Sequence, residues 1–505
     1  MTLPSASSVT PVIADGRKWL ILAAVGMCLF LGSVDGSIVN VALPTLMGEF
    51  NASFAAIQWV TLAYLIGLTI LLVGMGRLAD MMGKKLIFTT GIVLFLAGSA
   101  LCGLAPTVAW LIGFRFLQSI GAAMIIALGV AILTETWPAR ERGKVIGLSA
   151  GFISLGIVFG PAIGGIMLEY LSWHWIFFVN LPIGAVALVL VLLYLPPLRP
   201  SGHRETFDLL GAVLLGIGLL CATLALTAGQ EFGLDSPLMA GLIVAAVAAL
   251  AAFIYVEAHV RYPMLDLRLF REPQFSLNLL TATLTFIAIS GIVLLLPFYL
   301  ELVLGLPLRS VGLLMAVVPL AMAFIQPLSG TLSDRFGTRR VSVLGLVFIL
   351  FGYLSMAGLR VDGTEWEFAL RMLPVAIGMA TFNSPNNSAI MGSVPRERLG
   401  VASGTLSMVR TLGQVTGIAV LGALFTSRLN YYAGEPVNLR AADPTAIVAA
   451  MHDQFLVVAL LIFVGLVTAL LTWRWERTHA QRKADALAAE AAVVETATME
   501  ALVGE

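Results

Sequence analysis

The chain has 505 residues, of which 59% are hydrophobic and only 11% are charged. Soluble domains are about a quarter charged, so this composition excludes an ordinary soluble protein and indicates an integral membrane protein that lies in the lipid bilayer. The formal net charge of zero averages two membrane faces of opposite character, and we expect no nucleic-acid partner.

Apolar runs joined by short polar links repeat along the whole chain. Each run has about 18 to 26 residues, enough to cross roughly 30 Å of hydrocarbon as a helix. The pattern therefore predicts an all-α polytopic membrane protein. We expect about fourteen transmembrane helices, at residues 19–44, 56–76, 86–105, 108–134, 145–168, 175–195, 207–228, 237–257, 275–300, 310–330, 341–359, 368–391, 399–426 and 454–473.

Basic residues gather on one side of the predicted membrane. With links assigned to alternate sides, roughly 22 Lys and Arg residues lie on the side of the N-terminus and about 4 on the other. The positive-inside rule then places both termini in the cytoplasm and predicts a multi-pass protein of the cytoplasmic (inner) membrane. The first apolar run starts after Lys18 and continues to about Leu43, too long for a signal peptide, so we expect it to be retained.

Asp35 interrupts the first span, in the sequence FLGSVDGSIVNVALP from Phe30 to Pro44. A carboxylate inside a membrane is costly unless it is protonated, paired or in a wet cavity. A carboxyl group that alternates between protonated and ionised forms is suited to proton coupling. A solvated turn at the outer helix end is the alternative, but the apolar IVNVAL that follows favours the first interpretation.

The link after the second span, GRLADMMGKKL from Gly76 to Leu86, recurs as GTLSDRFGTRR from Gly330 to Arg340. Two basic loops that obey the positive-inside rule are the simpler alternative. The shared Gly, Leu, Asp, Gly and basic residues favour a duplicated half-molecule, with a substrate site at the interface of the halves. The candidate gating-loop residues are Gly76, Asp80, Gly83, Lys84 and Lys85 in the first copy, and Gly330, Asp334, Gly337 and Arg339 in the second.

These two loops also predict how the chain is divided. If each follows the second span of its half, six spans form each half and two spans are left between them. The predicted parts are a cytoplasmic N-terminal tail at 1–18, an N-terminal six-helix domain at 19–195, a linker with two extra transmembrane helices at 196–274, a C-terminal six-helix domain at 275–473 and a cytoplasmic tail at 474–505.

Arg115, in the segment WLIGFRFLQSIGAAM of the fourth span, is a second charge in apolar sequence. A guanidinium stays charged, so it needs a carboxylate, a polar neighbour or a water-filled cavity. Gln118 and Ser119 continue a polar stripe one turn on. We expect Arg115 and Asp35 to be the proton-coupling pair, close when the acid is ionised and apart when it takes a proton. A static ion pair is the alternative.

Glycines in the fifth span, GIVFGPAIGG, share one helix face, because Gly156, Gly160 and Gly164 are four residues apart. They permit the close approach of another helix. Pro161 adds a bend, since it has no N–H for the carbonyl four residues earlier. Generic small-residue packing would explain the three glycines alone, whereas Pro161 and Gly165 make the pattern more specific.

Three further charges occur in or near predicted spans. Glu301, in LPFYLELVLGLP, is either a solvated helix-end residue or, if it faces a central cavity, an acid that attracts a cationic substrate or takes part in coupling. Arg410, in SMVRTLGQVTG, is a membrane-embedded charge with no evident partner. Arg371 lies near an outer helix end, so we expect its charge to extend to the interface.

Motifs of several enzyme classes are absent from the sequence. It has no Walker A, HExxH or GxSxG motif, so we expect no ATP hydrolysis, no catalytic residue and no enzyme activity. Cys28, Cys102 and Cys221 lie in apolar runs, and the five histidines have no ligand spacing. Neither a metal site nor a cofactor is therefore expected. A non-transporting receptor or membrane enzyme is the rival class.

Several of these segments together resemble the major facilitator superfamily. The first loop resembles its loop signature, with Met81 in place of a basic residue, and LIGFRFLQSIGAA resembles its fourth-helix signature, with Ser119 in place of glycine. GIVFGPAIGG matches the antiporter signature. VDGSIVNVALP, WHWIFFVNLPIG and the two extra spans resemble the fourteen-span drug:proton antiporter branch, the EmrB/QacA type, with Val34 and Ser37 as conservative departures.

The resemblance covers nearly the whole chain except its tails. It implies the major facilitator fold and export of hydrophobic, often cationic drugs or toxic compounds in exchange for protons, by alternating access with the proton gradient as energy source. Expected partners are small amphipathic or cationic molecules and protons. We expect a monomer, either alone or with accessory periplasmic and outer-membrane components. The alternative is an exporter of one metabolite, such as an organic acid, amino acid or siderophore.

The first loop would then help to close the cytoplasmic gate. We expect Asp80 to pair there with a nearby basic group, Arg140 or Arg142.

Overall fold

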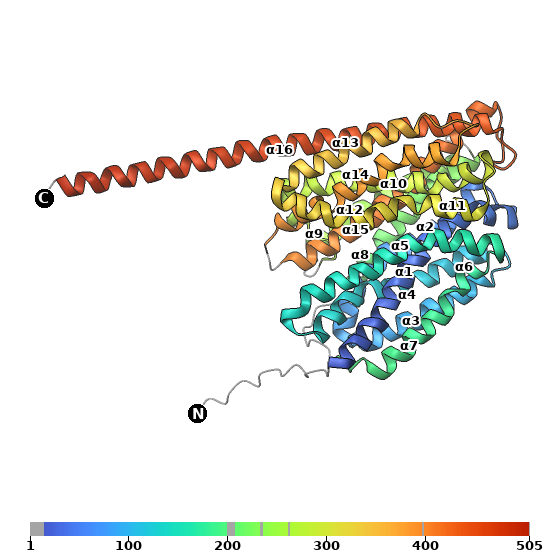
Figure 1. Ribbon diagram of the computed structural model, residues 1–505, viewed down its shortest axis with the longest axis horizontal. Coiled ribbons are helices and arrows are strands. Elements are labelled where there is room, and N and C mark those ends of the chain that lie inside the picture. Colours follow the sequence, from blue (N-terminus) through green and yellow to red (C-terminus); the bar gives the residue numbers. More distant parts are fainter. Residues whose placement is uncertain (1–14, 199–207, 233–235, 261–262, 396–397, 504–505) are drawn as a thin grey trace.

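The computed structural model describes residues 15–198, 208–232, 236–260, 263–395 and 398–503, and within these ranges the chain forms helices and no strand (Figure 1). The first helices are α1 (Asp15–Glu49), α2 (Phe54–Met82), α3 (Lys84–Gly103), α4 (Val108–Thr136), η1 (Ala139–Glu141), α5 (Arg142–Tyr170), α6 (Trp175–Phe178) and α7 (Asn180–Tyr194). Next come α8 (Leu209–Phe232), α9 (Pro237–His259) and η2 (Leu267–Arg271). The remainder are α10 (Pro273–Phe298), η3 (Tyr299–Val303), α11 (Leu308–Met315), α12 (Val317–Phe336), α13 (Thr338–Met356), α14 (Glu365–Gly392), α15 (Leu399–Ala433) and α16 (Pro444–Val503).

The described ranges contain 13 helical segments that are long and apolar enough to cross a membrane. The chain is therefore a multi-pass membrane protein. The predicted span at 368–391 lies in α14, which is not among those 13. Arg371 and the polar segment NSPNNS at 383–388 lower the hydropathy of this helix. The count of fourteen spans therefore stays a prediction.

Several helices extend beyond their predicted ends, among them α1 and α16. α1 continues past Pro44 to Glu49, because apolar residues follow the proline and keep the last turn packed. α16 has 60 residues and continues to Val503, projecting away from the other helices (Figure 1). Its last part is rich in Ala and Glu, which are strong helix formers.

The helices form two groups with a pair between them. In the N-terminal group, α1 packs against α4, α5 and α7, and α4 also packs against α2 and α3. In the C-terminal group, α10 packs against α15 and α16, and α14 packs against α12 and α13. α8 and α9 pack against each other, and α8 also contacts α2 and α15, one helix from each group. In Figure 1 the blue-to-teal helices lie on one side and the yellow-to-red helices on the other.

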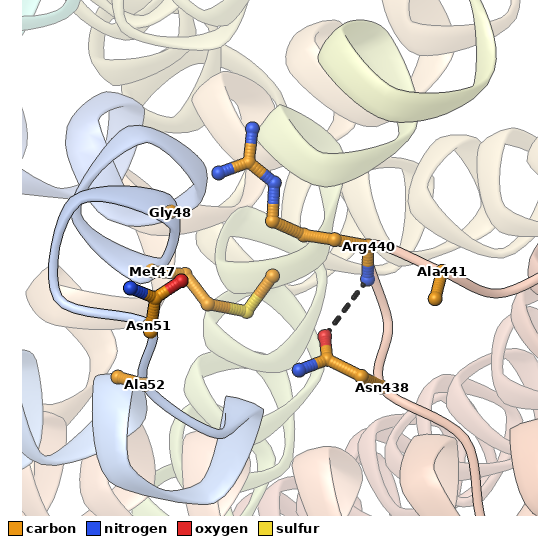
Figure 2. Close-up of a pocket in the computed structure, with 7 residues that line it drawn as sticks. All are labelled: Met47, Gly48, Asn51, Ala52, Asn438, Arg440 and Ala441. Carbon is orange, nitrogen blue, oxygen red and sulfur yellow. Dashed lines mark hydrogen bonds between the residues drawn. The ribbon is translucent and has the colours of Figure 1, made fainter.

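The two groups meet at the end of the bundle away from the chain termini, which we call the loop end. There the ring of Phe54 in α2 lies 5.3 Å from Phe298 and 5.5 Å from Phe425. Arg440, in the loop before α16, extends towards Gly48 near the end of α1 (Figure 2). Side chains of both groups therefore close the loop end.

At the opposite end, which we call the terminal end, α5 is packed on only one side. Between Arg142 and Gly151, Val145 and Ser149 are buried, whereas most other residues are exposed. A Cβ placed on Gly143, Gly147 or Gly151 would meet no atom within 4 Å. Side chains of both groups thus meet at the loop end, whereas at the terminal end one side of α5 has no packing partner among the described residues.

The two repeated loops have nearly the same backbone conformation. Gly83 joins α2 to α3 with φ of 98°, and Gly337 joins α12 to α13 with φ of 89°. Each glycine N–H donates to the carbonyl four residues earlier, that of Ala79 or Ser333. Because these φ values favour glycine, the matching geometry supports an internal duplication.

The positive φ at Gly83 predicts that alanine has different effects on stability at two glycines of the first loop. Gly83→Ala should destabilise the protein by about 1–3 kcal/mol, since alanine must adopt a positive φ. Gly76→Ala, inside α2 with open space around it, should be neutral or stabilise by about 0.5–1 kcal/mol. Thermal unfolding of the two purified variants in detergent measures the difference, and equal melting temperatures would contradict it.

Candidate functional site

Asp35 lies within α1, and its side chain has no exposed surface. Its carboxylate accepts hydrogen bonds from Arg115 Nη1 at 2.6 Å, Gln118 Nε2 at 2.8 Å and Asn180 Nδ2 at 3.1 Å. The donors belong to α4 and α7. One carboxylate therefore joins three helices, and the structure brings the predicted partners Asp35 and Arg115 together as a buried ion pair.

Arg115 is also held by groups other than the acid. Its Nη1 donates to Gln118 Oε1 at 2.7 Å, and its Nε donates to the carbonyl of Val60 in α2 at 3.2 Å. The guanidinium lies 4.2 Å from the centre of the Tyr64 ring, also in α2. These contacts fix the position of Arg115. Removing one partner of a buried ion pair is strongly destabilising, so Arg115 stays beside Asp35 while the acid is ionised.

Ser99 and Asn180 complete the cluster. Ser99, in α3, accepts from Asn180 Nδ2 at 2.8 Å and from Gln118 Nε2 at 3.2 Å, and donates to the carbonyl of Phe177 at 3.0 Å. Sequence reasoning missed both residues. Asn180 lies in WHWIFFVNLPIG, where the resemblance was its only signal, and Ser99 is a single hydroxyl in an apolar run.

Two buried polar atoms beside this cluster lack a hydrogen-bond partner among the described residues. They are the Tyr64 hydroxyl and the Asn180 Oδ1 atom. Buried polar groups are nearly always satisfied, so this acceptor and this hydroxyl are available for a further hydrogen bond, to water or to a side chain in another rotamer.

α5 joins the helix that carries Asp35 to the C-terminal group. A Cβ on Gly156 would lie 2.6 Å from the carbonyl oxygen of Phe30, and one on Gly164 would lie 2.7 Å from Ile38. These contacts lie on either side of Asp35 along α1. Gly160 lies between these two glycines in α5, and a Cβ placed on it would meet Ser37 of α1.

The other face of α5 contacts α11 of the C-terminal group. A Cβ on Gly165 would lie 2.9 Å from the Cα of Gly312, and one on Gly312 would meet the carbonyl of Pro161. α5 is thus packed at backbone distance against α1 on one face and against α11 of the C-terminal group on the other.

The first candidate gating loop is held by its lysines. Lys84 lies 3.4 Å from Asp80 and also pairs with Glu135 in α4. Lys85 donates to the carbonyls of Leu192 and Leu195 near the end of α7, at 3.1 Å and 2.5 Å.

The pairing expected of Asp80 with Arg140 or Arg142 is wrong for this conformation. Asp80 pairs with Lys84, one turn away, and Arg142 donates to the carbonyl of Thr134 at 3.1 Å. Arg140 is exposed. In this conformation Asp80 therefore pairs within its own loop.

The second loop contacts α10 and α14. Arg339 donates to Asn278 of α10, and Asp334 is exposed. Gly330 lies beside α14, where its Cβ would be 3.3 Å from the Ser384 hydroxyl.

Three other predicted charges lie away from the Asp35 cluster. Glu301 is in η3 at the loop end, and its Oε2 is buried without a hydrogen-bond partner among the described residues. Arg371 pairs with Glu367 at 2.8 Å. Arg410 lies in α15, with its guanidinium 5.0 Å from the Phe286 ring of α10. Among the described residues, no group of three or more His, Cys, Asp or Glu side chains is placed to hold a metal.

Comparisons with known proteins give one consistent family. The Major Facilitator Superfamily matches residues 25–418 and 279–501. The riboflavin transporter RibZ of Clostridioides difficile is 31% identical over 91% of this chain and 98% of its own. The multidrug resistance protein Stp of Mycobacterium tuberculosis is 32% identical over 84% of this chain and 79% of its own. The tetracenomycin C resistance and export protein of Streptomyces glaucescens is 30% identical over 84% and 79%.

Solved structures share the fold. A bacterial homologue of the human lysosomal transporter Spinster, in an inward-facing and unoccupied conformation, superposes with a TM-score of 0.68 at 16% identity, over 91% of this chain and 98% of its own. The nucleoside transporter NupG, as a mutant, gives a TM-score of 0.62 at 12% identity over 90% and 99%. These relatives and fold neighbours are transporters and not enzymes.

The buried pair predicts strongly non-additive effects on stability. Arg115→Gln should cost about 3–5 kcal/mol, because it leaves a buried carboxylate without its cation. Asp35→Asn combined with Arg115→Gln should cost less than the sum of the single changes, by about 0.5–3 kcal/mol. Unfolding of the four proteins in detergent measures this coupling.

The half-exposed pair Arg428 and Asp453, 3.4 Å apart, is the matched control. Its coupling should be below about 1 kcal/mol. Additive costs for Asp35 and Arg115 would show that the pair does not act as a unit.

Proposed function

The chain belongs to the Major Facilitator Superfamily, and we propose that it is a proton-coupled secondary active exporter of hydrophobic drugs or toxic compounds. In this proposal it is a fourteen-span drug:proton antiporter of the EmrB/QacA type, with two six-helix domains at 19–195 and 275–473 and two extra helices between them. Its energy source is the proton gradient, and both termini lie in the cytoplasm. It acts as a monomer, and any accessory periplasmic or outer-membrane component would be additional.

The observation that carries the proposal is the buried cluster around Asp35. Its carboxylate has no exposed surface and is charge-paired with Arg115. Such a group inside a membrane is a candidate functional site by default. The unused hydrogen-bonding atoms of Asn180 and Tyr64 support a second state in which Asp35 is protonated.

Protonation of Asp35 would change the hydrogen bonds of the whole cluster. The neutral acid has an O–H to donate and no longer balances the charge of Arg115. A side-chain amide both donates and accepts, so rotation of Asn180 would turn its Oδ1 towards the new donor. Arg115 would keep Gln118 and the Val60 carbonyl as partners, which limits the cost of separating it from the acid.

Alternating access would follow from the contacts of α5. In the proposed cycle, the change at Asp35 shifts α1, and the glycines of α5 transmit the shift to α11. The described conformation is closed at the loop end. The opposite state would close the terminal end, where Asp80 could then exchange Lys84 for a partner across the gate.

The relatives support two classes of substrate. Multidrug resistance and tetracenomycin export proteins among the relatives favour a hydrophobic drug, whereas a relative named as a riboflavin transporter favours one metabolite. Competition separates them, because inhibition by many unrelated amphipathic compounds would support drug export and a narrow inhibition profile would support a metabolite carrier.

Proteoliposomes test the coupling. A proton gradient should drive counterflow of an amphipathic dye by the native protein. Asp35→Asn should lower the gradient-driven flux at least tenfold, because its amide cannot exchange a proton. Asp362→Asn, which removes an exposed acid between α13 and α14, is the matched control and should behave as the native protein. Equal flux in Asp35→Asn would contradict the assignment and move coupling to another acid, with Glu301→Gln the next variant.

A further inference from the structure

A polar stripe runs along one face of α15. Ser403, Ser407, Arg410 and Gln414 follow one another at intervals of four, three and four residues, which places them on the same side of a helix. Ser403 is exposed and the other three are half-buried. A charged residue inside a membrane span almost always faces the bundle interior or a water-filled cavity, so we take the side of α15 that carries Arg410 to face such a cavity.

Arg410 is the one charge of this stripe, and it makes no ion pair or hydrogen bond with the described residues. Its Nε atom is buried without a partner, and its guanidinium lies against the Phe286 ring. Other arginines of the bundle are paired, for example Arg115 with Asp35, Arg371 with Glu367 and Arg428 with Asp453.

An unpaired guanidinium at this depth is costly, since cations inside membranes normally find an anion, a carbonyl or water. Phe286 provides one cation–π contact but no hydrogen-bond acceptor. The Asp35–Arg115 pair is neutral overall, so it does not offset the charge of Arg410. The described contacts therefore leave one positive charge, with open donors, on this polar stripe.

We propose that Arg410 binds an acidic group of the transported molecule, so that substrates include amphipathic compounds with a carboxylate. Guanidinium forms paired hydrogen bonds with such a group, and the buried Phe286 ring beneath it supports the guanidinium from the other side. The inference rests on the proposed export function and narrows its substrate class, in contrast to the cationic compounds that the sequence resemblance implies.

Binding to the full-length protein in detergent tests Arg410 without any transport. The probes are fluorescein, an anion, and rhodamine 123, a cation with the same ring system, each followed by fluorescence anisotropy. Arg410→Gln should weaken fluorescein binding by roughly tenfold or more and leave rhodamine 123 unchanged or tighter. Arg410→Lys should retain part of the affinity, and Arg428→Gln on the same helix is the matched control.

Loss of both dyes in Arg410→Gln with a normal melting temperature, equal fluorescein binding in all variants, or no fluorescein binding by the native protein would each overturn the proposal. Failure of the export function is distinguishable from these results. If fluorescein binding depends on Arg410 but no proton gradient moves the dye in proteoliposomes, the anion site stands and proton-coupled export fails.

Discussion

A buried ion pair is the constraint on which the N-terminal group depends. Asp35 and Arg115 are both inaccessible, so each must keep its partner or lose its charge. Asp35 lies in α1 and Arg115 in α4, and Arg115 also donates to the Val60 carbonyl in α2. Gln118, Ser99 and Asn180 extend the hydrogen bonds to α3 and α7. A change in the charge of this one carboxyl group would therefore alter hydrogen bonds that involve five helices.

Close packing extends that influence across the molecule. Gly156 and Gly164 hold α5 against α1 on either side of Asp35, and Gly165 holds it against α11. Interfaces packed at backbone distance respond as discrete states and not by gradual deformation. In the proposed account the N-terminal group holds the exchangeable proton, the C-terminal group holds the unpaired Arg410, and α5 makes proton and substrate interdependent.

Sequence predicted most of the helices, because hydropathy records the thickness of the bilayer directly, and it predicted the repeated loops, whose glycines have matching positive φ. The Asp35–Arg115 contact followed from the cost of burying charge. Ser99 and Asn180 could not be found in this way, since single polar residues lack periodicity and these two are 81 positions apart. The wrong partner for Asp80 has another cause, because a sequence does not specify which conformation is described. Sequence analysis singled out Arg410 but missed the stripe at 403, 407, 410 and 414, because the serines and the glutamine carry no charge that marks them in an apolar run.

Proton release on substrate binding tests the central claim most directly. Purified protein in weakly buffered detergent solution is mixed with a transported dye, and the pH change is recorded with a soluble indicator. The account predicts about one proton released per bound dye by the native protein, since one acid is the proposed carrier, and none by Asp35→Asn. Equal release from both proteins would show that Asp35 does not carry the exchanged proton.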